Sequence, residues 1–296
     1  MAPPPLRELA TGVYAWIQPG GVAGVANAGV IADADGLTVV DTLMVRSQWE
    51  PFAAAVAGLG APVRRVVLTN GHVDHVGGTR AFPAASVYGS RHTSDALDLA
   101  MPVDAYRNFW PELADEFDDL AAVGTRPVTH LVDGAAQLTP RVELLPASGF
   151  TSGDVVVLVA DAEVCFTGGL GWFGVTPLGW ESDFEAWIAT LDVLTELADV
   201  LVPGHGPVGG APEAGTLADY LRACVAARGD LRALGRGPWD DWADHRCDAV
   251  NVERASLLAE GRNELPPSMV RILTGSPPSA PPGTTPSAPP GAAPSM

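Results

Sequence analysis

Short apolar runs and longer amphipathic segments alternate along most of the chain. The apolar runs are rich in β-branched residues and are bounded by Gly, Asn or Asp, as strands are. They predict two sets of strands, at residues 13–18, 28–32, 37–41, 65–69 and 86–89, and at residues 131–132, 142–146, 155–160, 164–167 and 200–203. Helical spacing predicts helices at residues 47–59, 94–101, 105–122, 184–198, 213–228 and 241–260. Two strand-rich halves interleaved with helices indicate a layered α/β fold.

The apolar pattern stops near residue 275, which divides the chain into three predicted regions. Residues 1–210 hold both sets of strands and form the main domain. Residues 211–274 are predicted to be a helical extension packed on it, because apolar residues such as Leu217 and Leu221 recur there at helical spacing. Residues 275–296 are rich in Pro, Ser and Ala. This composition buries too little apolar surface to offset its ordering entropy, so we expect a disordered tail.

The charge of the chain restricts its partners. Its 17 basic residues are all arginine and face 35 acidic residues, which gives a formal net charge of −18. Phosphate contacts need clustered cations, so we expect a small-molecule substrate and neither nucleic acid nor an anionic membrane as partner. No apolar run reaches the roughly 18 residues of a membrane span, and the N-terminus lacks the apolar stretch of a signal peptide. Together with three widely spaced cysteines, this favours a cytoplasmic protein.

The strongest candidate site is residues 69–78, Thr-Asn-Gly-His-Val-Asp-His-Val-Gly-Gly, directly after a predicted strand. Its His72, Asp74 and His75 lie close enough in sequence to turn toward one point. His205 lies in a Pro-Gly-His-Gly turn after another predicted strand. Imidazole and carboxylate groups in this pattern suit a divalent cation such as zinc. The alternative is that these histidines cap helices or hydrogen-bond to the backbone.

The same ten residues resemble the T-H-x-H-x-D-H-x-G-G signature of the metallo-β-lactamase superfamily. Further segments match motifs of that family in order and spacing, at residues 27–29, 40–42, 149–154, 166–169 and 203–206. The resemblance runs from about residue 12 to residue 210. It implies an αββα sandwich with the active site along one edge of its two sheets.

The chain departs from this family at three positions that usually carry metal ligands. In the family, seven side chains usually hold two metals. Asn70, Phe150 and Gly169 stand where two histidines and a bridging aspartate are expected. The ligands that the chain retains are His72, Asp74, His75 and His205. The resemblance therefore implies one zinc ion in the second site of the family, held by Asp74, His75 and His205, with a fourth position open.

These residues predict a mononuclear zinc hydrolase for an ester, thioester or lactone. His72, without a metal partner, suits a general base, unless it only hydrogen-bonds and positions Asp74. Asp74 is a second candidate for moving a proton, at the leaving group. Asn70 either donates to a developing oxyanion or braces its loop. Aromatic residues such as Trp110 and Trp180 suit an apolar or ring-bearing substrate, although core packing explains them equally well.

A different class of function fits the same sequence. Phe150 and Gly169 remove donor atoms from the family's first site and leave it apolar. The alternative hypothesis is a metal-free member of the family that binds a small molecule or catalyses a cyclisation, dehydration or isomerisation, as in secondary metabolism.

Overall fold

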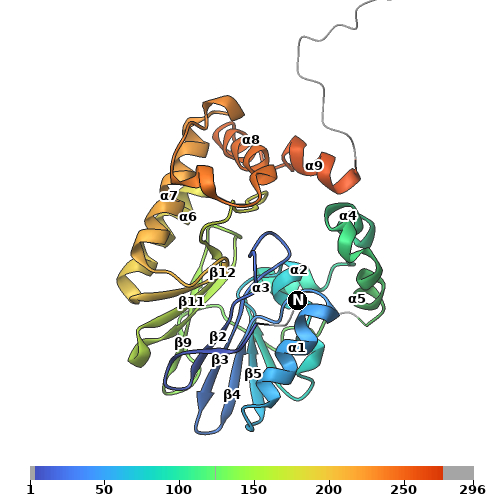
Figure 1. Cartoon of the computed structure of the whole chain (residues 1–296), viewed down its shortest axis with the longest axis vertical. Coiled ribbons are helices and arrows are strands. Elements are labelled where there is room, and N and C mark those ends of the chain that lie inside the picture. Colours follow the sequence, from blue (N-terminus) through green and yellow to red (C-terminus); the bar gives the residue numbers. More distant parts are fainter. Residues whose placement is uncertain (1–3, 124, 276–296) are drawn as a thin grey trace, which may run out of the picture.

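A computed structural model describes residues 4–123 and 125–275. Two β-sheets pack face to face, and helices cover their outer faces (Figure 1). Helix α1 lies outside the first sheet, and helices α6 and α7 lie outside the second. This arrangement confirms the predicted αββα sandwich. The predicted disordered tail falls almost wholly on residues outside the described ones.

Within the described residues the first sheet has seven strands, in the order β1 to β7. Their bounds are β1 Arg7–Ala10, β2 Val13–Trp16, β3 Ala28–Asp33, β4 Gly36–Val40, β5 Val63–Val67, β6 Ser86–Gly89 and β7 His130–Leu131. Adjacent strands from β1 to β4 pair antiparallel, whereas adjacent strands from β4 to β7 pair parallel. The carboxyl ends of β4 and β5 therefore meet at one edge of the sheet.

The described part of the second sheet has five strands, in the order β12-β11-β10-β9-β8. Their bounds are β8 Ala136–Gln137, β9 Val142–Ala147, β10 Asp154–Val159, β11 Val164–Trp172 and β12 Val200–His205. Only the pair β11 and β12 is parallel, and in its register Trp172 lies opposite His205. The short strands β1 and β8 carry no apolar run, which explains why the sequence pattern did not predict them.

The helices at residues 46–57, 184–197 and 211–226 lie close to their predicted positions, the helix at 91–97 begins and ends earlier than predicted, and those at 73–76 and 267–274 were not predicted. Their bounds are α1 Arg46–Ala57, α2 Val73–Val76, α3 Arg91–Leu97, α4 Val103–Phe109, α5 Phe117–Val123, α6 Phe184–Leu197, α7 Ala211–Ala226, α8 Asp248–Ala259 and α9 Pro267–Thr274. The single helix predicted at residues 105–122 is wrong: a 3-10 segment, Pro111–Glu116, separates α4 from α5 because proline cannot continue a helix. The helix predicted from residue 241 begins only at Asp248.

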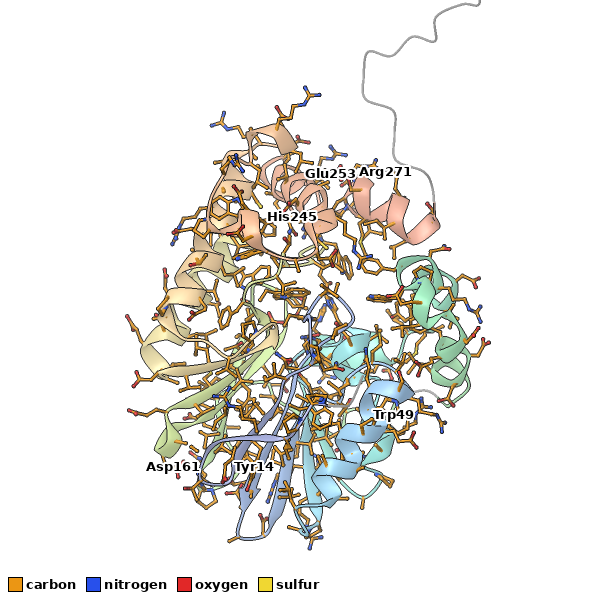
Figure 2. All side chains as sticks on the ribbon, in the orientation of Figure 1. Tyr14, Trp49, Asp161, His245, Glu253 and Arg271 are labelled. Carbon is orange, nitrogen blue, oxygen red and sulfur yellow. The ribbon has the colours of Figure 1, made fainter. Side chains whose placement is uncertain are left out.

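Apolar side chains alternate between the two faces of the strands. On β10, Val155, Val157 and Val159 face the first sheet, whereas Val156 and Leu158 face helices α6 and α7. Side chains accordingly fill the space between the sheets in Figure 2. Trp49 of α1, labelled there, packs on the outer face of the first sheet. This packing fixes the strand ends where the site residues lie.

None of the described helices combines the length and the apolar content needed to cross a bilayer.

Candidate metal centre

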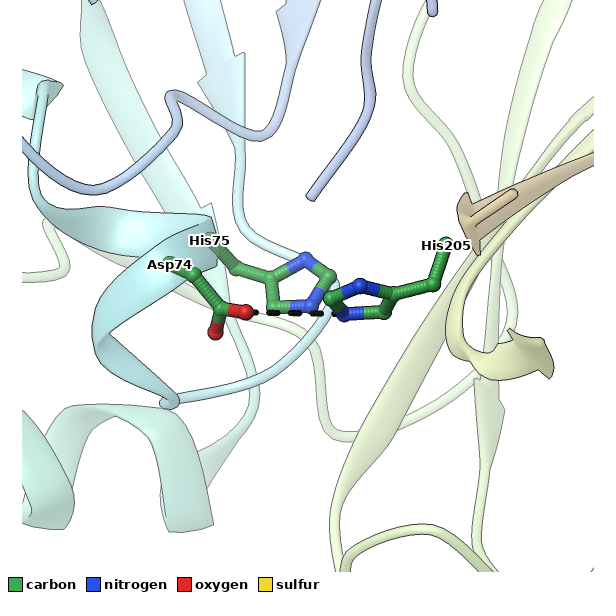
Figure 3. Close-up of side chains that lie close together, drawn as sticks. All are labelled: Asp74, His75 and His205. Atoms are coloured by element: carbon green, nitrogen blue, oxygen red, sulfur yellow. Dashed lines mark ion pairs between the residues drawn. The ribbon is translucent and has the colours of Figure 1, made fainter. Parts of the chain in front are cut away.

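Three buried side chains from two distant segments meet at the edge of the sandwich (Figure 3). Asp74 and His75 lie on α2, a single helical turn that follows β5, and His205 is the last residue of β12. One ligand atom of each lies within 4.8 Å of those of the other two. Nε2 of His205 lies 3.5 Å from Oδ2 of Asp74. Side chains 130 residues apart in sequence thus converge on one point.

His75 is held by a carboxylate at the end of β4. Its Nδ1 donates to Oδ2 of Asp41 over 2.7 Å, and Asp41 in turn accepts hydrogen bonds from the backbone N–H and hydroxyl of Thr69. Asp41 has a left-handed φ of 57°, a strained conformation for a residue other than glycine. With Nδ1 occupied, the buried Nε2 of His75 finds no hydrogen-bond partner among the described residues. This nitrogen is therefore free to bind a further group.

His205 is fixed in the same way by a backbone carbonyl. Its Nδ1 donates to the oxygen of Gly21 over 3.0 Å, and its ring stacks on Trp172 with centroids 3.6 Å apart. Burial lowers the pKa of His205 to about 3, so its ring is neutral. Its Nε2 is also buried and has no hydrogen-bond partner in the part of the chain that the structure describes. Gly21 permits this contact because a Cβ there would lie 2.3 Å from the backbone N of Gly206.

The carboxylate of Asp74 completes the group. Burial raises its pKa, but the charges of His75, His205 and His72 and a 3.0 Å hydrogen bond from the Gly24 N–H outweigh burial and lower it. Burial likewise disfavours a charge on His75, but Asp41 and then Asp74 raise its pKa. The negative field that favours a proton on His75 also favours a cation beside it.

Two imidazole lone pairs and one carboxylate, each oriented by a hydrogen bond, make a donor set that fits zinc. Structural and catalytic zinc sites use these ligand types, and catalytic sites keep three protein ligands and one open position. The fit rests on the two buried Nε2 atoms, since an unpaired buried polar atom is costly unless something else contacts it.

Comparisons with known proteins agree with this geometry. Residues 21–205 match the family model of the metallo-beta-lactamase superfamily, which is more than half of the 296 residues. The chain belongs to the metallo-beta-lactamase superfamily. This confirms the resemblance that the sequence motifs indicated. No curated protein matches the sequence.

Solved structures of the superfamily share the fold at low identity. The metallo-beta-lactamase FIM-1 from Pseudomonas aeruginosa, in its mono-zinc form, is 17% identical with a TM-score of 0.55, covering 74% of this chain and 94% of that one. A metallo-beta-lactamase from Erythrobacter litoralis is 20% identical with a TM-score of 0.55, covering 72% and 94%. The inverting sec-alkylsulfatase Pisa1 from Pseudomonas sp. is 17% identical with a TM-score of 0.60, covering 86% of this chain and 50% of that one.

The three positions that depart from the superfamily motifs lie together beside the group of three. A Cβ on Gly169 would lie 2.1 Å from the ring of Phe150, so this ring fills the space that a side chain at residue 169 requires. Phe150 is 1% exposed and packs edge-on against His72 and Trp187. Asn70 is fully buried, and its Oδ1 accepts from the His72 N–H over 2.9 Å, a bond that braces the loop. The substitutions therefore form one packed unit.

His72 lies next to this unit and not in the group of three. Its Nε2 is 2.5 Å from Oε1 of Glu181, and its ring stacks on Trp180 with centroids 5.5 Å apart. Burial raises the pKa of Glu181, but the hydrogen bond and charge of His72 outweigh burial and lower it, so the carboxylate is ionised. Sequence reasoning missed Glu181, because a lone glutamate 109 residues away from His72 carries no signal.

Sequence reasoning also missed the loop at residues 21–24, which supplies the Gly21 carbonyl and the Gly24 N–H. The aromatic residues of α4 and the following segment hold this loop: Nε1 of Trp110 donates to the Ala23 carbonyl over 2.8 Å. Trp110 is 8% exposed and belongs to the core cluster on that side. Trp110 is therefore explained by core packing and not by contact with a substrate. Trp180, by contrast, is only half-buried.

The buried carboxyl of Asp154, at the start of β10, should make the stability of the fold depend measurably on pH. Complete burial raises its pKa to about 7, although Thr151 donates two hydrogen bonds to it. A carboxyl whose pKa is higher in the folded than in the unfolded chain stabilises the fold at low pH, and this stabilisation is lost as pH rises from about 4 to about 7. The unchanged protein should lose on the order of 4 kcal/mol of unfolding free energy over this pH range. The Asp154→Asn variant should not show this loss. Urea unfolding of both proteins at several pH values measures it; parallel pH profiles would contradict the assignment.

Proposed function

We propose that the protein is a mononuclear zinc hydrolase that cleaves an ester, thioester or lactone of a small apolar or aromatic molecule. The observation that carries the proposal is the pair of buried Nε2 atoms of His75 and His205, which have no hydrogen-bond partner among the described residues, in two side chains that lie close to the Asp74 carboxylate. The hydrolase chemistry of the superfamily and the zinc in FIM-1 support this choice.

Asp74, His75 and His205 would hold the ion and leave a fourth position for water or substrate. When bound, zinc supplies Lewis acidity, which polarises a carbonyl and lowers the pKa of water toward about 7. Asp41 and the Gly21 carbonyl keep each ring in the tautomer that presents Nε2. With Nε2 of His72 directed at Glu181, its Nδ1 is the nitrogen that can accept a proton, so we assign the general base to this pair.

Metal analysis together with an ester assay tests the proposal. Protein purified without chelator should contain about one equivalent of zinc and should hydrolyse aryl esters or aryl thioesters. Removing the metal with a chelator should abolish hydrolysis, and adding zinc should restore it. Protein that contains no zinc, takes up none and cleaves no member of such a panel would refute the hydrolase.

Asp41→Asn should weaken zinc binding by about 10- to 100-fold, because a neutral amide holds the His75 ring less firmly than a carboxylate does. Competition with a chelating dye measures the affinity. Asp161→Asn is the matched control: Asp161 is an exposed residue paired with Arg141 and is labelled in Figure 2, far from the site. Equal affinities in the two variants would show that Asp41 does not orient His75.

One observation favours the second candidate, a metal-free binding protein or non-hydrolytic enzyme. The Phe150 ring occupies the space beside Gly169 and makes this part of the site apolar. An apolar surface of this kind stabilises a ring-bearing ligand that is bound without metal. The metal analysis above separates the two candidates, since only the hydrolase depends on bound zinc.

A further inference from the structure

A cavity of about 640 Å³ opens between three segments that carry none of the three candidate metal ligands. Its walls are Ser148, Gly149, Thr151 and Ser152, the N-terminal end of α6, and the C-terminal part of α8 with the loop that follows it. Trp180 and Glu181 also line it, whereas Asp74, His75 and His205 do not. The cavity is therefore distinct from the metal centre, although Glu181 touches both His72 and this space.

A buried arginine lines this cavity. Arg254, on α8, is only 4% exposed. Its Nε donates to the Ser182 carbonyl over 3.0 Å, and its Nη2 donates to the Glu181 carbonyl and to Oδ1 of Asn263. These three acceptors are neutral. No carboxylate of the described residues lies within ion-pair distance of Arg254, and Nη1 makes no hydrogen bond to any of them. A guanidinium that is buried without a counter-ion is rare, because a buried charge is costly unless it is paired.

The carboxylates that line the same cavity are already engaged. Glu181 accepts from His72, Glu264 pairs with Arg262, and Asp183 caps α6 by accepting from the backbone N–H of Ala186. Burial lowers the pKa of Arg254 more than the neighbouring Glu181 and Asp183 raise it. Asp183 is exposed to solvent, so the buried charge that lacks an ion-pair partner among the described lining residues is that of Arg254.

We infer that the cavity binds a small organic monoanion, with its carboxylate at Nη1 of Arg254 and its apolar body against Trp180, Leu258 and Leu265. Nη1 carries two N–H donors, and a bond between charged groups is stronger than one between neutral groups. The single guanidinium can pair with one negative charge, and the three carboxylates that also line the cavity repel a phosphate dianion more strongly than a monoanion. The apolar lining and the volume suit a body of about the size of one aromatic ring.

Isothermal titration of the full chain with benzoate tests this site, with benzyl alcohol as the uncharged analogue. Benzoate should bind with a 1:1 stoichiometry and about tenfold or more tightly than benzyl alcohol, since a hydrogen bond to a charged group contributes at least that factor. Ala186→Trp fills the cavity without touching Arg254 and should abolish binding. Ala189→Trp, at an exposed position of the same helix, should retain it.

Benzoate can also coordinate zinc, so the titration is repeated after chelation and with the His205→Ala variant. Unchanged binding in both supports a site that is separate from the metal centre, whether or not the protein is a hydrolase. Binding that disappears with the metal, or that survives Ala186→Trp, overturns the inference. Equal affinity for benzoate and benzyl alcohol, or no binding of benzoate at millimolar concentration, overturns it as well.

Discussion

His205→Ala is expected to weaken zinc binding by more than about 100-fold and to abolish ester hydrolysis. Loss of a group that only orients a ligand costs about 10- to 100-fold in affinity, and loss of the ligand itself costs more. The substitution leaves Asp74 and His75 as the only two of the three donors, and two protein ligands hold zinc poorly. Zinc content after dialysis and competition with a chelating dye measure the effect.

The matched control for this variant is His130→Ala. His130 is an exposed histidine on β7 that stacks on Tyr88, far from the three side chains in the sequence. It should leave both zinc affinity and hydrolysis unchanged. Because His205 also contacts Trp172, circular dichroism must show that the His205 variant is folded. A folded His205→Ala protein that retains one tightly bound zinc would place the metal elsewhere.

Gly169→Asp, which restores the carboxylate that the superfamily motif carries, is expected to destabilise the fold by about 3 kcal/mol or more. A Cβ at this position would lie 2.1 Å from the Phe150 ring and 2.9 Å from Nδ2 of Asn70, so the neighbours have to move. Overpacking of a core alone costs about 1–3 kcal/mol, and an unpaired buried carboxylate adds to this. Urea unfolding measures the change in the free energy of unfolding.

The second variant of this experiment replaces Phe150 as well. If the Phe150 ring causes the strain, Phe150→Ala with Gly169→Asp should be more stable than the sum of the two single changes indicates. Gly134→Asp is the control for an added carboxylate, because nothing lies within 4 Å of a Cβ there. Additive effects of residues 150 and 169 would show that the two substitutions are independent.

The patterns that predicted strands and helices depend on near neighbours in the sequence. The apolar run at residues 155–160 predicts a strand, and the structure buries Val155 in one core cluster and Val156 in another. Helix α6 buries Trp187, Leu191 and Leu194 at the predicted spacing. The prediction of one helix at residues 105–122 was wrong because Pro111 interrupts it. Local pattern therefore predicted the layers, and it did less well at the boundaries.

The sequence by itself determined the superfamily, the sandwich and the identity of Asp74, His75 and His205 as a candidate group, because motif and periodicity are local properties of the chain. Only the tertiary structure decided what orients these side chains, since the partners Asp41, Gly21 and Gly24 come from other segments. It also decided that Phe150 fills the space beside Gly169. Arg254, likewise, is buried with no carboxylate of the described residues within ion-pair distance. Contacts between distant segments depend on how the layers pack, which no local pattern encodes.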